Sequence, residues 1–232
     1  MMTFRDAMDR FFDDAFTRPL NFAGNNWSVP AVDMYQTDNE VVVKASIPGV
    51  KTDEVQISVT GETAPHYFSL TDDIVAHQLS MAKMKPPLRT EKDRKMIIDG
   101  LRDGTIDVIA TDHAPHSVNE KMQEMEYAPF GIIGLETALP LIITVLIKEN
   151  GFSFTEAFEK ITINPARILK LDRGAIKLGA IADITIIDPE KQVELTESFF
   201  RSKSKNTPFI GKKLYGSVEY TICNGTIVYS AR

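Results

Sequence analysis

The sequence contains few of the side chains that form disulfides or bind metals. Cys223 is its one cysteine, and its four histidines are His66, His77, His113 and His116. A single cysteine excludes an intrachain disulfide and a multi-cysteine zinc site, and it favours a reducing compartment. We therefore expect a cytoplasmic protein in which any metal site depends on histidine and carboxylate ligands.

The sequence also lacks long hydrophobic runs and an excess of basic residues. Its longest apolar run, residues 138–147, is too short to span a bilayer and contains Pro140. No basic-then-apolar leader opens it, and the formal net charge is -6, whereas binding to phosphate groups requires a basic patch. The sequence thus predicts neither a membrane partner nor a nucleic-acid partner.

What is present is the composition of an ordinary globular protein. Of the 232 residues, 43% are hydrophobic and 25% are charged, values that are typical of a soluble domain. This length suits one large domain or two small ones.

The first quarter of the sequence predicts one helix and three strands. Phe4–Phe16 has apolar residues at helical spacing, so residues 1–27 predict an amphipathic helix followed by a linker. Val32–Gln36 and Glu40–Ile47 predict two strands around a turn. Alternation of apolar and polar residues across Val55–Val59 predicts a third, half-buried strand.

This quarter resembles the small heat-shock proteins. The strings that carry the resemblance are Met8-Asp9-Arg10-Phe11-Phe12-Asp13, Pro30-Ala31-Val32-Asp33-Met34-Tyr35, Ile47-Pro48-Gly49-Val50 and Asp53-Glu54-Val55. The resemblance covers about residues 1–61 and implies a truncated α-crystallin-like β segment over residues 28–61, because the later strands of that family do not follow. A half sandwich of this kind leaves strand edges unpaired, which favours self-association.

The remaining sequence has a βα pattern over residues 59–182 and is β-rich over residues 183–232. Thr90 with Asp93 three positions later predicts the start of a helix that ends at Gly104. Ile106–Ala110 predicts a short buried strand, and Leu135–Lys148 predicts a long apolar helix. Near the end, Asn224-Gly225 between two alternating runs predicts a hairpin.

Histidine and aspartate follow two of these strands directly. Asp112 comes just after the buried strand, with His113 and His116 behind it, and His66 follows the strand that ends near Glu62. Polar groups at neighbouring strand ends can share one divalent metal, and the carboxylate can also accept a proton. The spacing also fits an alternative in which His66 caps a loop and Asp112 accepts hydrogen bonds from backbone amides.

Six ordered strings occur between about Val59 and Tyr229. They are Glu62-Thr63-Ala64-Pro65-His66, Met84-Lys85-Pro86-Pro87-Leu88-Arg89, Asp103 to His116, Ala128 to Thr137, Asn164-Pro165-Ala166-Arg167 and Lys203 to Phe209. Together they resemble the C-terminal part of bacterial dihydroorotase, in the amidohydrolase superfamily. The resemblance implies an α/β fold: a partial TIM-type (β/α) barrel of the amidohydrolase type with a C-terminal β-sandwich portion. The string at residues 55–63 fits a strand in both families, so the sequence reads as a fusion.

The resemblance implies a role for each matched position. His66 matches a histidine ligand of the second metal, and Asp112 matches the aspartate that binds the first metal and acts as general base and acid. His116 matches a substrate-binding histidine. Pro129, Phe130 and Gly131 match a loop whose backbone meets the pyrimidine ring. Lys85 stands where the family often has a substrate-binding asparagine, and a lysine offers a cation without an acceptor.

The family's reaction is the reversible hydrolysis of a cyclic amide, dihydroorotate to carbamoyl aspartate, with zinc as cofactor. Residues 1–65 contain no histidine or cysteine, and no His-x-His pair occurs anywhere. A catalytic zinc usually has about three protein ligands, and His66 with Asp112 supplies two. We therefore expect a weak or partial zinc site and no activity from this chain by itself.

Two alternatives stay open at this point. One is an interaction protein, in which the heat-shock-like segment drives self-association or chaperone activity. The other is a full enzyme that a separate chain completes by supplying the missing strands. In each case we expect a homo-oligomer, and a small molecule of the dihydroorotate type is the expected substrate if the protein is active.

Overall fold

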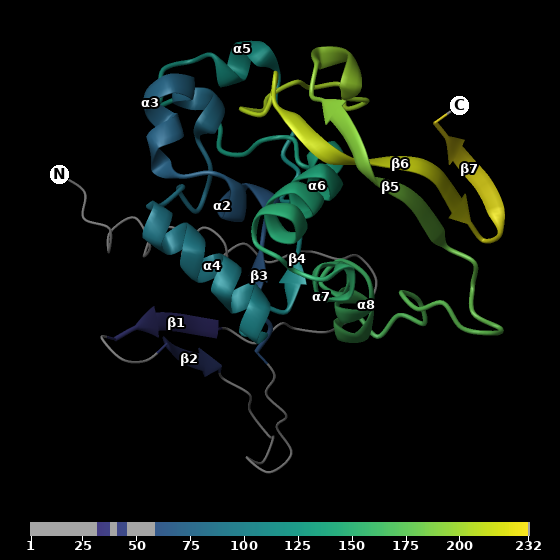
Figure 1. The fold of residues 1–232 in the computed structure, drawn as a ribbon. Coiled ribbons are helices and arrows are strands. Elements are labelled where there is room, and N and C mark those ends of the chain that lie inside the picture. The colour runs from purple at the N-terminus through teal and green to yellow at the C-terminus, as the bar shows by residue number, and fades with distance from the viewer. Residues whose placement is uncertain (1–31, 38–40, 46–58, 232) are drawn as a thin grey trace, which may run out of the picture. The chain divides into compact units, whose positions relative to one another are not determined.

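The computed structural model describes residues 32–37, 41–45 and 59–231 (Figure 1). The chain divides into two compact units, Met1–Ser58 and Val59–Arg232. The helix expected over residues 4–16 and all but the last residue of the strand expected at Val55–Val59 lie outside the described residues. The domain boundaries expected near residues 28, 59 and 183 stay predictions.

In the first unit the structure describes one pair of strands. β1 (Val32–Gln36) and β2 (Val41–Ala45) are antiparallel, with Val32 opposite Ala45 and Gln36 opposite Val41. The two strands predicted there are confirmed.

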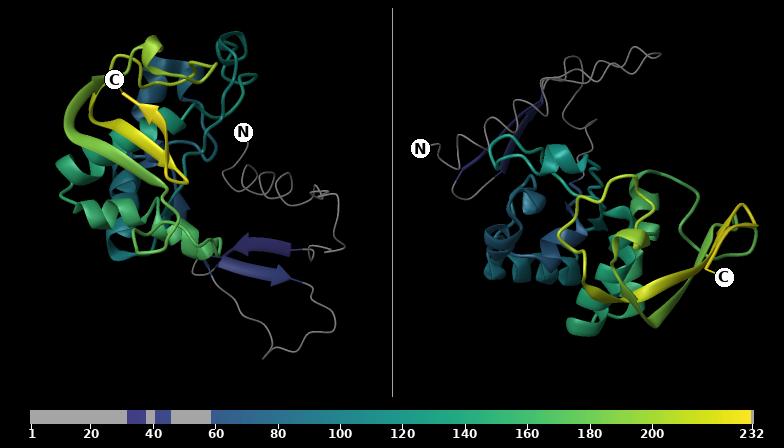
Figure 2. Two further views of the ribbon diagram at one scale, coloured as in Figure 1. Left: turned by 90° about the vertical axis from the view of Figure 1, so that its right-hand side faces the viewer. Right: turned by 90° about the horizontal axis from the view of Figure 1, so that it is seen from above.

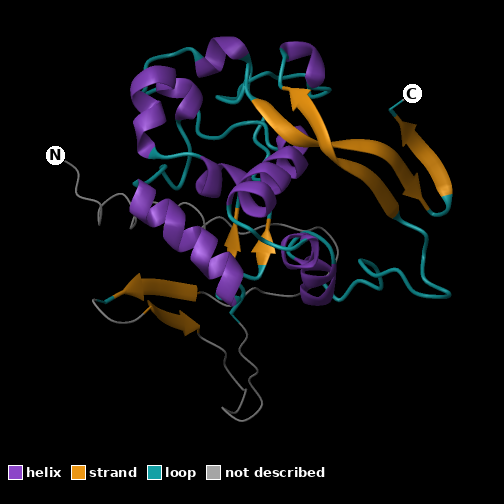
Figure 3. Ribbon diagram, in the orientation of Figure 1, coloured by secondary structure: helices purple, strands orange, loops and turns teal. Residues whose placement is uncertain are grey.

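The second unit contains two short parallel strands, and each is followed in the sequence by a series of helices (Figure 3). β3 (Glu62–Thr63) pairs with β4 (Val108–Ile109), with Glu62 opposite Val108. Between them lie α2 (Pro65–Ser69), the 3₁₀ helix η2 (Asp72–Ile74), α3 (Val75–Gln78), the 3₁₀ helix η3 (Leu79–Ala82) and α4 (Glu91–Asp103). After β4 come α5 (Val118–Lys121), α6 (Leu135–Leu141), the π-helix η4 (Ile142–Glu149), α7 (Phe154–Glu159) and α8 (Ile163–Ile168).

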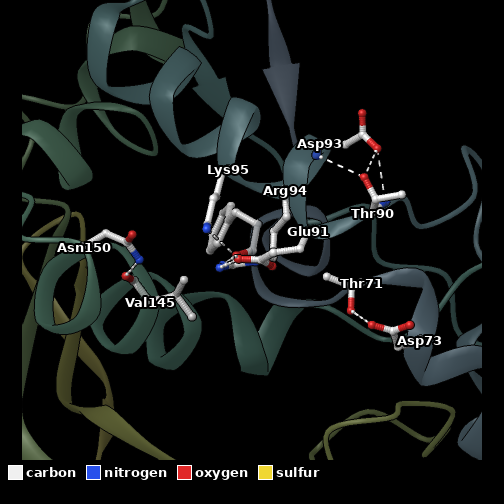
Figure 4. Close-up of polar contacts among 10 residues, drawn as sticks. Thr71, Asp73, Thr90, Glu91, Asp93, Arg94, Lys95, Val145 and Asn150 are labelled. Atoms are coloured by element: carbon white, nitrogen blue, oxygen red, sulfur yellow. Dashed lines mark hydrogen bonds and ion pairs between the residues drawn. The ribbon is translucent and has the colours of Figure 1, made fainter.

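The α4 helix begins and ends as its sequence predicts. The Thr90 hydroxyl accepts a hydrogen bond from the Asp93 N–H, and the Asp93 carboxylate accepts one from the Thr90 N–H at 3.1 Å, which completes a capping box (Figure 4). Gly104 ends the helix with a φ of 86°, a conformation that glycine adopts without steric cost. Arg94 then connects α4 to α2 by donating to the Phe68 carbonyl at 2.9 Å.

The long apolar helix expected at Leu135–Lys148 is present, but its second half is a π-helix. α6 contains Pro140, which has no N–H to donate to the carbonyl four residues earlier. From Ile142 the helix continues as η4, with its hydrogen bonds spanning five residues. Ile142, Ile143 and Leu146 of η4 are fully buried in the core.

The C-terminal strands form one curved antiparallel sheet in the order β5-β6-β7. They are β5 (Ile184–Glu194), β6 (Lys213–Cys223) and β7 (Thr226–Ser230), and the 3₁₀ helix η5 (Glu197–Phe199) follows β5. The predicted hairpin at Asn224-Gly225 is confirmed, since both residues have positive φ as a type I′ turn requires. β5 and β6 are each 11 residues long and lie within the segment expected to be β-rich, residues 183–232.

The sheet packs on α6 and η4 (Figure 2). Gly216 of β6 lies so close to η4 that a Cβ there would be 2.4 Å from the Ile143 Cδ1 atom. Next to it, the Tyr215 N–H donates to the Thr144 hydroxyl at 2.7 Å. Glycine is therefore required at position 216, because any side chain would clash with Ile143 and because a φ of 105° is unfavourable for other residues.

The parallel β3–β4 pair confirms the expected α/β character, and an isolated parallel bridge joins His113 to Ile132 beside it. A barrel, partial or complete, stays a prediction. Among the described residues, no helix has the length and apolar character needed to cross a membrane.

Candidate functional site

His66 lies in the first turn of α2, immediately beyond the carboxyl end of β3. Pro65 opens this helix, which suits a position where a backbone N–H has no partner in any case. The His66 side chain is 2% exposed, and its Nε2 atom is buried without a hydrogen-bond partner. Burial lowers the pKa of His66 to about 4, so the imidazole is neutral at physiological pH. A neutral, buried nitrogen without a partner is a group suited to binding a metal ion.

Asp112 lies at the corresponding end of β4. Its φ of 48° is in the left-handed region, which is uncommon for a residue other than glycine and marks local backbone strain. Burial raises the pKa of the Asp112 carboxyl, and the charge of Glu62 raises it further. The side chain is still 48% exposed, so its carboxylate reaches solvent on one side.

The two side chains face each other because their strands are paired. His66 Nε2 and Asp112 Oδ2 are 3.6 Å apart, which is too long for a hydrogen bond. Two ligands on one tetrahedral zinc ion, each about 2.1 Å from it, lie about 3.4 Å from each other. The 3.6 Å separation is close to that expected for two ligands of one metal ion, whereas the resemblance to dihydroorotase implies different metals for His66 and Asp112.

His66 and Asp112 are two side chains that could bind a metal ion. No group of three histidine, cysteine, aspartate or glutamate side chains within the described ranges is arranged to hold a metal ion. A histidine nitrogen and a carboxylate oxygen are ligand types that zinc accepts, and the buried His66 Nε2 has no hydrogen-bond partner that would compete with a metal.

An open pocket of about 530 Å³ lies next to Asp112. Its lining includes Glu62, Tyr67, Lys85 and Arg89. The Tyr67 hydroxyl donates to the Pro86 carbonyl at 2.9 Å, and burial together with the charge of Asp112 raises the pKa of this phenol. Sequence reasoning missed Glu62 and Tyr67 as residues beside Asp112, although Glu62 belongs to a string that it had singled out and Tyr67 directly follows that string.

His116 contacts the loop that was expected to meet the substrate. Its Nε2 atom is 2.9 Å from the Phe130 carbonyl, and its backbone N–H donates to Asn206 Oδ1 at 3.1 Å. The buried Asn206 amide donates in turn to the carbonyls of Ala114 and Gly131. Asn206 thus joins the two segments, a role that the sequence did not indicate.

Lys85 lies near Phe130 of the same loop. Its ammonium is 5.7 Å from the centre of the Phe130 ring, and the residue lines the pocket together with Asp112. The structure therefore brings Asp112 and Lys85 to one pocket, with His66 next to Asp112 and Phe130 near Lys85. His116 and Pro129–Gly131 are not among the residues that line this pocket.

His113, which had no expected role, caps α6. Its Nδ1 atom accepts hydrogen bonds from the N–H groups of Gly134 at 3.0 Å and Leu135 at 3.3 Å. His66 Nε2 has no hydrogen-bond partner, so this atom caps no loop, and the alternative structural role of His66 stays a prediction.

Residues 48–228 match the profile of the amidohydrolase family. The chain belongs to this family. The match begins within the segment that resembled the heat-shock proteins, and the matches give no support to a heat-shock-like domain. Amidohydrolases are generally metal-dependent, typically with zinc.

Relatives among characterised amidohydrolases match this chain over part of their length. It is 50% identical over 202 residues to the dihydroorotase of Clostridioides difficile strain 630, covering 84% of this chain and 48% of that protein. Against the dihydroorotase of Endomicrobium trichonymphae it is 53% identical over 174 residues, covering 75% of this chain and 41% of that protein. Its fold is similar to that of the L-hydantoinase (dihydropyrimidinase) from Arthrobacter aurescens, with a TM-score of 0.70, 28% identity, and coverage of 74% and 39% of the two chains. The chain thus spans less than half the length of these relatives.

The neutral, buried His66 predicts a loss of stability in acid. Between pH 6.5 and about 4 the unfolded chain binds a proton at His66 that the folded chain excludes, so the free energy of unfolding falls as the pH falls. The full difference corresponds to about 3 kcal/mol. Urea unfolding across this pH range measures it, and His66→Gln is expected to remove this part of the pH dependence.

His77→Gln is the control, because His77 is exposed on α3 and its removal is expected to leave the pH dependence unchanged. Equal pH dependence in the wild type and in His66→Gln would contradict the assignment of a neutral imidazole.

Proposed function

We propose that this chain is the C-terminal portion of a dihydroorotase-like hydrolase, with His66 and Asp112 as part of its metal site. The observation that carries the proposal is the 3.6 Å separation of His66 Nε2 and Asp112 Oδ2 at the ends of two paired parallel strands. Identity of about 50% to two dihydroorotases supports the same reaction class, hydrolysis of a cyclic amide.

Asp112 is proposed to move the proton in this reaction. A carboxylate whose pKa is raised accepts a proton more readily and can later return it to the leaving amide nitrogen. His66 and Asp112 would hold zinc, which when bound supplies Lewis acidity toward an amide carbonyl.

The substrate is proposed to be a dihydroorotate-type small molecule. His116 and the backbone of Pro129, Phe130 and Gly131 are proposed to contact its ring. Lys85 lines the pocket beside Asp112 and offers a positive charge to a substrate carboxylate.

The matches bear differently on the two alternative functions that the sequence left open. The chaperone-like function depends on residues 1–61 and receives no support from the matches. Completion by a separate chain is compatible with a chain that spans less than half of its relatives, and it stays a prediction.

The chain by itself is expected not to hydrolyse dihydroorotate above background, because two protein ligands hold zinc poorly. The assay follows dihydroorotate and carbamoyl aspartate with and without added zinc. Hydrolysis that rises with zinc and disappears in Asp112→Ala would contradict this prediction, and it would show that the two ligands suffice.

Zinc is expected to bind weakly and to depend on both His66 and Asp112. His66→Ala and Asp112→Ala are each expected to weaken zinc binding at least about tenfold, since each removes one of two ligands. Calorimetric titration measures the dissociation constants. His77→Ala serves as the matched histidine control, and tight binding that survives His66→Ala would place the ligands elsewhere.

Self-association is expected because β5 and β7 are edge strands of their sheet. Ile186 of β5 is 46% exposed, so an added strand from a second copy would cover it. Light scattering on a size-exclusion column is expected to show a dimer or larger species that Ile186→Lys shifts toward the monomer. Leu178→Lys, in an exposed loop, is expected to have no effect. A compact wild-type monomer at micromolar concentration would contradict the prediction.

A further inference from the structure

Lys121 is a fully buried lysine at the end of α5, outside the metal site. Its exposed fraction is 0%, yet its ammonium nitrogen makes two hydrogen bonds to backbone carbonyls. One acceptor is Lys83 at 3.1 Å, and the other is Pro129 at 3.0 Å. Lys121 therefore joins the segment that leads to Lys85 with the loop that contains Phe130.

Lys83 holds the same loop from the opposite direction. Its Nζ atom donates to the carbonyls of Ala128 at 2.7 Å and Glu126 at 3.2 Å, and it lies 4.4 Å from the centre of the Phe130 ring. The Lys83 carbonyl also accepts the Gly131 N–H at 2.9 Å. The backbone of residues 126–131 is thus held at four groups by two lysines.

A lysine at position 121 is costly to fold. Burial, together with the nearby charge of Lys83, lowers its pKa to about 8. A methionine of similar length would avoid this desolvation, but it would leave the Pro129 carbonyl without its lysine donor. The hydrogen bonds from Lys121 to the carbonyls of Lys83 and Pro129 offset part of this desolvation cost.

We propose that Lys83 and Lys121, together the lysine clasp, are positioning residues that hold the backbone of residues 126–131 in place to receive a cyclic amide ligand. The proposal rests on the proposed function, because only that function assigns a ligand to the loop. Phe130 and Gly131 are the residues that the proposed function assigns to ligand contact, and the clasp would act through them. A binding loop fixed in advance loses less conformational entropy when its ligand arrives.

The chain offers a matched control in Lys160. This lysine is also buried, at 6% exposure, and its ammonium donates to a backbone carbonyl, that of Ile106 at 2.8 Å. Its contact precedes β4 in the sequence, on a segment away from the loop. Lys160→Met therefore removes a buried lysine and its hydrogen bond without touching the clasp.

The test compares Lys83→Met, Lys121→Met and Lys160→Met in the full chain. Hydrogen exchange of the amides of residues 127–133 is expected to become at least about tenfold faster in both clasp variants and to stay unchanged in Lys160→Met. With zinc present, the dissociation constant for dihydroorotate is expected to rise at least about tenfold in the clasp variants, while that for zinc stays within about twofold.

The outcomes separate the clasp from the proposed function. Unchanged loop exchange in the clasp variants, or an equal effect of Lys160→Met, would overturn the positioning role. Parallel losses of zinc and dihydroorotate binding would also overturn it, since they would indicate general destabilisation. A wild-type chain that binds zinc but no dihydroorotate would contradict the proposed substrate. Hydrogen exchange of the loop amides would then be the measurement that tests whether the clasp holds the loop. If Lys121→Met fails to fold, the half-buried Lys83 still allows the comparison.

Discussion

The parallel pairing of β3 with β4 is the contact on which the candidate site depends. Each strand is only two residues long, but their register sets Thr63 beside Ile109 and so brings the following residues to one edge. His66 and Asp112 come from positions 46 residues apart in the sequence, and no local element connects them. If the register shifted by one residue, one side chain of the pair would be directed elsewhere.

Both members of this pair are held in unfavourable states. His66 is an imidazole whose buried Nε2 has no hydrogen-bond partner, and Asp112 has a left-handed backbone next to another carboxylate, Glu62. Strain and unsatisfied polar groups of this kind persist only where the surrounding structure imposes them, and they concentrate at functional sites. Part of the surrounding structure here is the cap on α6: the His113 side chain accepts hydrogen bonds from the start of that helix, which fixes the residue that follows Asp112.

Local chemistry made much of the fold predictable. The α4 helix could be located from Thr90, Asp93 and Gly104 because capping groups act within a few residues. The Asn224-Gly225 hairpin was equally clear, because its turn requires two residues that tolerate positive φ. The change to a π-helix after Pro140 was not predicted, because a proline removes one donor without specifying how the following turns pair.

The site was predictable to the extent that it follows strand ends. His66 and Asp112 were singled out because each follows a predicted strand, and the structure places them 3.6 Å apart. Asn206 and Lys121 were not, since their partners lie across the fold and nothing in the local pattern distinguishes them from exposed polar residues. A buried lysine is rare enough that sequence reasoning assigns such a residue to the surface.

Electrostatics connects the strained pair to a cation. Burial and the charge of Glu62 both disfavour ionisation of Asp112, and burial also disfavours a proton on His66. A divalent cation bound by these side chains would favour the ionised carboxylate and the neutral imidazole together. It would oppose the rise in the pKa of Asp112, and it would bind the imidazole in the neutral form that burial already favours. The arrangement that costs stability in the free chain is therefore the one that a metal ion would stabilise.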